Sequence, residues 1–171
     1  MRRLLAIIFF TILSVSTPAI AQSLTDTCRL SIRTQIAYTQ ATPIGRLQPK
    51  TLYFDFYTLP DHADTLKPLV ITVFGGAFVA GSRTYEDMIA WCVQLARRGY
   101  AAATIDYRLL PPTQFTPDNL IRTGYMAAQD VSTAVRYFKA HSDEFGIDTN
   151  RNIPVGQFGR LGGHFAPALH G

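Results

Sequence analysis

A continuous apolar run, Pro68 to Phe74 (PLVITVF), restricts the fold of this chain more than any other segment. Consecutive β-branched and apolar residues are typical of a strand that is covered on both faces, as in a parallel sheet. Gly75 and Gly76 follow directly, and apolar residues then recur at helical spacing from Met88 to Ala96, just before Gly99. The run therefore predicts a buried strand, a glycine-rich turn and a helix in succession.

The neighbouring segments extend this alternation. Apolar and polar residues alternate from Leu52 to Tyr57, which predicts a half-buried strand, and the turn residues at 60–64 suggest that it is the first arm of an antiparallel pair. A second buried strand is expected over Tyr100–Ile105, followed by a helix over roughly 121–145 that ends at Gly146. Strands and helices in this order favour right-handed crossovers and an α/β fold, with a mostly parallel, doubly wound sheet.

The first residues have the pattern of a secretory signal peptide. Arg2 and Arg3 precede a nearly unbroken apolar stretch from Leu4 to Val15, and Ala19-Ile20-Ala21 then offers a small-residue cleavage site. The stretch is shorter than the roughly 20 residues of a transmembrane helix, although an uncleaved anchor remains the alternative. We therefore expect an exported protein, periplasmic or secreted, that begins at Gln22 and keeps no stable membrane anchor.

Charge and cysteine content narrow the function classes. Without the signal peptide the chain has 14 basic and 12 acidic side chains and no Lys/Arg run, which argues against nucleic-acid binding. Cys28 and Cys92 are the only cysteines. Export permits a disulfide between them, whereas the apolar surroundings of Cys92 favour a buried free thiol, so both possibilities stay open. No set of side chains has a zinc-like spacing, and we expect no metal or other cofactor.

Other charged residues have a structural interpretation. Asp106 and Arg108 follow the second buried strand, and we expect them to form an ion pair with each other. Asp130 lies on the second helix and is expected to cap or pair there.

The glycine turn carries the main chemical signal. Its sequence from Phe74 to Ser82 is FGGAFVAGS. Glycines allow a close approach of the backbone and leave N–H groups pointing outward, and at the carboxyl end of a parallel strand such groups can bind a developing oxyanion. A turn that merely closes a strand–helix connection needs the same residues, so the turn alone does not decide between the two.

Four segments together resemble a known family. The glycine turn resembles the HGGGF-type oxyanion loop of α/β-hydrolase esterases and lipases. The segments RRGYAAA (97–103), IDYRL (105–109) and FGIDTNR (145–151) resemble further family motifs, in the family's order. The chain is most similar to secreted bacterial carboxylesterases, including the feruloyl and acetyl-xylan esterase branch.

The resemblance implies an oxyanion hole built from Gly75, Gly76 and Ala77, with backbone N–H groups of Gly76 and Ala77 as donors. It also implies a substrate that is a small-molecule or polysaccharide-linked ester. Phe74 departs from the family pattern, because a His usually stands at this position and helps to hold the loop.

A larger departure concerns the nucleophile. The family continues with a buried strand and a G-x-S-x-G elbow that carries the catalytic Ser. Here residues 153–171 read IPVGQFGRLGGHFAPALHG, no Ser follows Ser142, and Pro154 falls where the strand is expected. Aligning the glycines of the elbow places Arg160 at the nucleophile position, and Arg cannot accept an acyl group. The chain thus offers no catalytic residue.

His164 and His170 receive no role, since the family's acid and His come later in the chain order. The sequence therefore predicts a signal peptide (1–21), an N-terminal extension (22–50) and the N-terminal part of an α/β-hydrolase domain (51–171), truncated at the elbow. For a suitable choice of codons, shifting the reading frame by a single nucleotide over residues 153–161 encodes GNSAG, which is an elbow sequence.

We accordingly expect a carboxylic-ester hydrolase lineage, represented by a truncated or frameshifted and inactive chain. The alternatives are a non-catalytic half-hydrolase that binds a ligand or partner, and a peptidase of the same fold.

Overall fold

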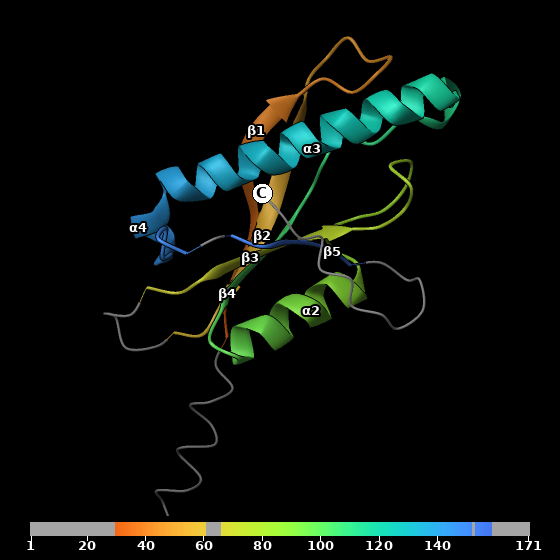
Figure 1. Ribbon diagram of the computed structural model, residues 1–171. Helices are drawn as coiled ribbons and strands as arrows, with labels where there is room; N and C mark the ends of the chain where they lie inside the picture. Colours follow the sequence, from red (N-terminus) through yellow and green to blue (C-terminus); the bar gives the residue numbers. More distant parts are fainter. Residues whose placement is uncertain (1–29, 61–65, 152, 159–171) are drawn as a thin grey trace, which may run out of the picture.

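One mixed sheet organises the protein. A computed structural model describes residues 30–60, 66–151 and 153–158 (Figure 1). Five strands lie in the order β1-β2-β4-β3-β5. Their bounds are Ser31–Ala41 (β1), Lys50–Thr58 (β2), Leu69–Phe74 (β3), Ala101–Ile105 (β4) and Val155–Phe158 (β5). Strand β3 is parallel to both β4 and β5, while β2 is antiparallel to both of its neighbours. The predicted α/β fold is confirmed, although only the two strand pairs that β3 forms are parallel and the sheet of the described residues is mixed.

Helices cover both faces of this sheet. Figure 1 shows α2 (Glu86–Arg97) on one face and α3 (Pro117–Ala140) on the other. The 3₁₀ helix η1 (Pro112–Gln114) precedes α3, and the short α4 (Ser142–Phe145) follows it. Helix α3 begins earlier than the apolar spacing predicted, because the Thr116 hydroxyl accepts a hydrogen bond from the Asn119 N–H at 3.1 Å and Pro117 occupies the first helical position.

The end of this helical region is also different from the prediction. His141 separates α3 from α4, so residues 121–145 do not form one continuous helix. Gly146 ends α4 with φ +62°, a left-handed conformation that glycine adopts at low cost, as the sequence predicted.

The pairing of β2 corrects one expectation. Its hairpin partner is β1, which precedes it, and on its other side Phe54 lies opposite Ile105 and Tyr57 opposite Ala102 of β4. The strand is therefore not the first arm of a hairpin with β3. The sequence did not predict β1, which lies within 22–50, because only Tyr38 among its residues is buried and the strand shows no apolar period.

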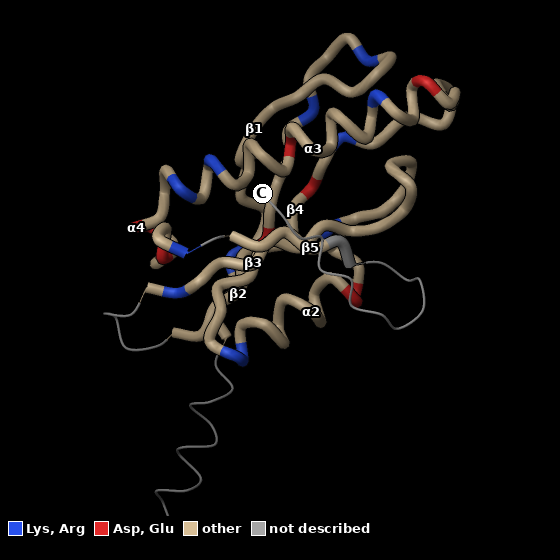
Figure 2. Tube along the Cα trace, in the orientation of Figure 1, with Lys and Arg blue, Asp and Glu red and all other residues tan. Residues whose placement is uncertain are grey.

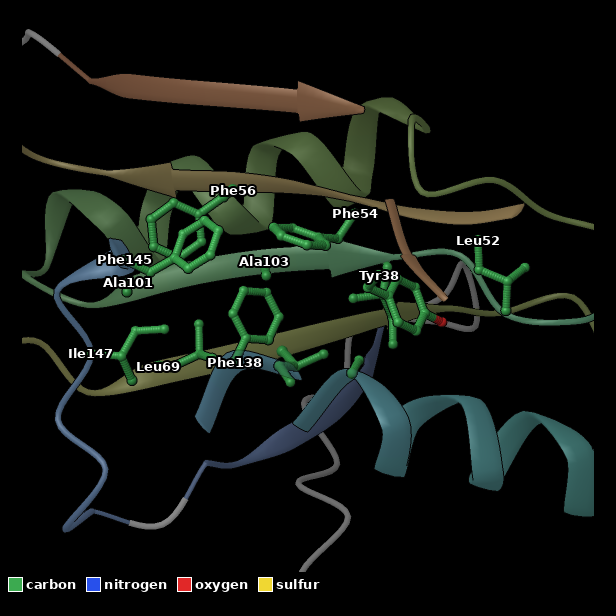
Figure 3. Close-up of a cluster of buried hydrophobic side chains, with 13 residues drawn as sticks. Tyr38, Leu52, Phe54, Phe56, Leu69, Ala101, Ala103, Phe138, Phe145 and Ile147 are labelled. Atoms are coloured by element: carbon green, nitrogen blue, oxygen red, sulfur yellow. The ribbon is translucent and has the colours of Figure 1, made fainter. Parts of the chain in front are cut away.

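Apolar side chains cover β2 on both faces of the sheet. The strand is therefore not half-buried, as the alternation of apolar and polar residues from Leu52 to Tyr57 suggested. Phe54 and Phe56 pack toward α3 and α4, where the Phe54 ring centroid lies 4.6 Å from that of Phe138 and 5.7 Å from that of Phe145 (Figure 3). Tyr57 instead belongs to a cluster with Cys92 and other residues of α2. Both faces of the sheet therefore contribute to the core.

Cys92 is a buried free thiol, 3.4 Å from the Thr72 hydroxyl oxygen. Burial raises the pKa of this thiol to about 12, so it stays protonated at neutral pH. Cys28, its possible disulfide partner, and the signal peptide (1–21) lie outside the described residues. Among the helices that the structure describes, none combines the length and apolar character needed to cross a membrane.

Candidate active site

The glycine turn leaves β3 at the carboxyl edge of the parallel strands. Gly76 has φ +133°, and the next two residues, Ala77 and Phe78, have φ +50° and +63°. Two successive non-glycine residues in the left-handed region are uncommon and store backbone strain. The N–H groups of Val79 and Ala80 both donate to the Gly76 carbonyl oxygen, at 3.0 and 3.2 Å, which closes the turn on itself.

Gly76 and Ala77 are exposed at the top of this turn. Within the described part of the chain, no acceptor takes a hydrogen bond from the N–H of either residue. Successive free N–H groups in a strained turn form a concavity that suits an anionic oxygen. The oxyanion role that the sequence predicts for Gly75, Gly76 and Ala77 stays a prediction, and the structure gives the geometry of the turn that would carry it.

Phe74 supports the turn from below in place of a polar side chain. Its ring stacks on Tyr107 with centroids 4.4 Å apart and an interplanar angle of 23°, and the Tyr107 hydroxyl donates to the Phe74 carbonyl oxygen at 2.8 Å. Burial raises the pKa of Tyr107 to about 12, so this phenol remains a neutral donor. A backbone hydrogen bond from Leu110 N–H to the Phe78 carbonyl oxygen, 2.8 Å long, joins the turn to the segment that follows β4.

Sequence reasoning missed the role of Tyr107, although this residue lies in the IDYRL segment. The feature that could have indicated this role is the position of Tyr107 just after the buried strand β4. From there a phenol can reach β3, the neighbouring parallel strand.

A buried charge network ties the end of the turn to the sheet. Arg83 lies 2.8 Å from Asp106 (Nη1 to Oδ2) and 3.2 Å from Asp55 (Nε to Oδ1). Burial opposes the charge of Arg83, but the carboxylates of Asp106 and Asp55 outweigh it and raise its pKa. Asp106 also accepts a hydrogen bond from the Tyr53 N–H at 3.3 Å. The expected Asp106–Arg108 pair is therefore wrong, because Arg83 occupies Asp106.

Arg108 points instead to helix α3. Its Nη2 lies 2.7 Å from Oδ1 of Asp130, its Nε donates to the same carboxylate at 2.9 Å, and its backbone N–H donates to Oδ2 at 2.9 Å. Arg108 Nη2 also donates to the Met126 carbonyl oxygen at 3.0 Å. Asp130 thus pairs as expected, and the pair anchors the segment after β4 to the helix that covers it.

Strand β5 ends beside the glycine turn. Phe74 and Phe158 are partners in the parallel ladder, so the chain leaves β5 next to the point where the turn begins. Pro154 does not interrupt this strand, which starts at Val155, and its carbonyl oxygen accepts a hydrogen bond from Ile71 N–H at 3.0 Å. The sequence-based objection to Pro154 is therefore wrong. Arg160, His164 and His170 lie outside the described residues.

No group of three or more His, Cys, Asp and Glu residues in the described part of the chain is arranged to hold a metal ion.

Comparison with known proteins decides the family. A family model described as BD-FAE matches residues 54–171, which is more than half of the chain. The chain belongs to the BD-FAE family. Its relatives include the isoprenylcysteine alpha-carbonyl methylesterase ICME of Arabidopsis thaliana, which is 33% identical over 112 residues covering 66% of this chain and 23% of the relative. Esterase LipC of Mycobacterium tuberculosis is 36% identical over 83 residues, covering 48% and 18%.

Solved structures agree with this BD-FAE assignment. A bacterial heroin esterase aligns with a TM-score of 0.53 and 30% identity, covering 81% of this chain and 39% of the other. Esterase Est22 with p-nitrophenol shares the fold, with a TM-score of 0.54, 22% identity and coverage of 81% and 41%. The BD-FAE chain thus has the α/β-hydrolase fold of these esterases, and it spans less than half the length of each of these relatives.

Proposed function

We propose that this chain belongs to a lineage of serine carboxylesterases and that its glycine turn is the oxyanion-binding loop of that chemistry. The observation that carries the proposal is the parallel register of Phe74 with Phe158, which brings the turn and the exit of β5 together. A nucleophile just after β5 would then leave the sheet at the same edge as the free N–H groups of Gly76 and Ala77.

The chemistry of such a site is acyl transfer. A Ser hydroxyl at the exit of β5 attacks the ester carbonyl, and a His takes the proton while an acid orients that His. Negative charge then develops on the former carbonyl oxygen. The Gly76 and Ala77 N–H groups stabilise that charge, because they are fixed in a strained turn and need no reorganisation during the reaction.

We infer that this polypeptide does not itself perform the reaction. Residues 143–171 contain no Ser, and Arg160 takes the nucleophile position. A guanidinium group stays protonated at any ordinary pH and has no free electron pair for attack. Hydrolysis by this chain therefore lacks its first step.

A local change of reading frame accounts for this sequence. For a suitable choice of codons, a single-nucleotide shift over residues 153–161 encodes GNSAG, which places an elbow Ser where this chain has none. Reading the gene decides the matter, since an adjacent frame without an elbow Ser over these codons refutes the proposal.

Small esters are the substrate class that fits the lineage. The relatives are esterases by name. We also propose export of the protein, on the basis of Arg2, Arg3 and the apolar stretch that follows.

The oxyanion role has a direct test that needs no nucleophile. Methylphosphonate carries tetrahedral anionic oxygens like those of the reaction intermediate, so its titration into the ¹⁵N-labelled protein should shift the amide signals of Gly76 and Ala77 most strongly. Neutral trimethyl phosphate is the matched control and should leave both signals in place. Shifts that occur elsewhere while Gly76 and Ala77 stay unchanged would refute an oxyanion loop.

A further inference from the structure

An open groove of about 730 Å³ lies next to the glycine turn. Three segments line it: the loop between β1 and β2 together with the first residue of β2 (43–50), Val79 of the turn, and the residues that follow β4 (109–112). Val79 N–H donates to the Gly76 carbonyl oxygen at 3.0 Å. The groove therefore reaches the turn at Val79, three residues after Gly76 and two after Ala77, the proposed oxyanion donors.

Apolar side chains form most of its surface. Leu110 is 1% exposed and belongs to the body of the protein, whereas Leu47 is 97% exposed and makes almost no contact with the fold. The other apolar residues that line the groove are Pro43, Pro49, Val79, Leu109, Pro111 and Pro112. Such a surface gains free energy when the apolar body of a ligand covers it.

All of the charge on this lining has one sign. Arg46 and Lys50 are the charged residues among those that line the groove, and the segment 42–50 (TPIGRLQPK) contains no acid. Figure 2 shows the same distribution, with Lys and Arg but neither Asp nor Glu on the loop between β1 and β2. A ligand that fits both features has an apolar body and a negative charge.

Contacts join the segments around the groove. The Leu110 N–H to Phe78 O hydrogen bond of 2.8 Å links the residues after β4 to the glycine turn. The loop between β1 and β2 lies against the side chain of Gln114, just beyond the third segment: a Cβ at Gly45, where φ is +70°, would lie 2.7 Å from Cδ of Gln114.

We propose that this groove is a binding subsite for a small organic carboxylate, with the apolar body on the proline–leucine surface and the carboxylate at Arg46 and Lys50. Its volume lies within the range of small-molecule pockets, and two cations match one carboxylate better than they match a polyanion. The identity of the substrate rests on the proposed function: it would be an ester with a carboxylate group at a distance from the bond that is cleaved.

Binding of 3-phenylpropanoate to the purified protein tests this subsite, with neutral 3-phenylpropanamide as the matched ligand. Exposed ion pairs each contribute about 0.2–1 kcal/mol, so two of them should make the carboxylate bind roughly 2–30-fold more tightly than the amide. Amide signals of Leu47, Val79 and Leu110 should shift in ¹⁵N spectra. Raising the salt concentration to about 0.5 M should remove the difference between the two ligands.

The double variant Arg46→Gln/Lys50→Gln should bind both ligands equally, while Arg97→Gln, which removes an exposed cation in the last turn of α2, should keep the preference. Both changes alter exposed side chains, so folding should be unaffected. Equal binding of acid and amide by the unaltered protein, or signal shifts away from the groove, would overturn the subsite. If methylphosphonate does not shift the amide signals of Gly76 and Ala77, that result contradicts the proposed function but leaves the subsite unaffected.

Discussion

Asp130→Ala should lower the free energy of unfolding by about 3 kcal/mol, the low end of the loss seen when a buried ion pair is broken. The Asp130 side chain is 3% exposed and that of Arg108 13% exposed, so the change strands a guanidinium group that water reaches only in part. The short hydrogen bond that the guanidinium group of Arg108 keeps is the one to the Met126 carbonyl oxygen, at 3.0 Å. Urea unfolding measures the loss.

Two comparisons separate pairing from mere removal of atoms. Glu144→Ala breaks the exposed Arg33–Glu144 pair, whose side chains are 43% and 48% exposed, and should cost less than about 1 kcal/mol. The double variant Arg108→Met/Asp130→Leu should recover most of the loss, because two apolar side chains leave no unpaired charge. Losses of equal size in Asp130→Ala and Glu144→Ala would show that burial of the pair does not matter.

Gly76→Ala should cost about 2–4 kcal/mol, since it combines backbone strain with a steric clash that no side-chain rotation relieves. Gly76 has φ +133°, and a Cβ placed there would lie 2.0 Å from the Ala80 carbonyl oxygen. That oxygen is backbone, so the turn itself must open. The variant should also lose the methylphosphonate response of the Ala77 amide.

Gly99→Ala is the control for the conformational part of this cost. Gly99 has φ +88°, but a Cβ there would meet nothing within 4 Å, so only the left-handed penalty of about 1–2 kcal/mol applies. Thermal or urea unfolding of the two variants side by side gives the comparison. If Gly76→Ala were no worse than Gly99→Ala, the close approach of Ala80 would have no energetic role.

The sequence predicted the parallel centre of the fold well because its strands are dictated by local composition. The runs that became β3 and β4 are apolar on both faces, and helices cover both faces of the sheet there. The same reasoning failed for β1, an edge strand in which Gln35 has φ +57° and the register with β2 shifts twice. Its stability comes from β2 and not from its own pattern.

Side-chain pairing was harder to predict than strands. Asp106 and Arg108 are close in sequence, yet alternate residues at a strand end reach different neighbours: Asp106 meets Arg83, and Arg108 meets Asp130 of α3. The choice depends on how the turn and helix approach β4, which is tertiary information. Likewise, the sequence marked Phe74 as a departure from the family pattern, but its stacking on Tyr107 appears only in the fold.

The glycine turn itself was located correctly from sequence, because its residues are unusual in any other context. The neighbouring strand β5 was not predicted correctly, because the sequence pattern treated Pro154 as incompatible with it. In the structure β5 begins only at Val155, and the carbonyl oxygen of Pro154 accepts a hydrogen bond from β3. A proline just before a strand costs no hydrogen bond.

The central proposal is that this chain keeps the oxyanion loop of an esterase and lacks its nucleophile. The most direct test is hydrolysis of p-nitrophenyl acetate by the purified protein, with mass spectrometry after exposure to an aryl fluorophosphonate that labels activated serines. The account predicts release of p-nitrophenol at the rate of buffer alone and no phosphonate adduct. Steady turnover that persists through a second purification, together with an adduct on this chain, would contradict it.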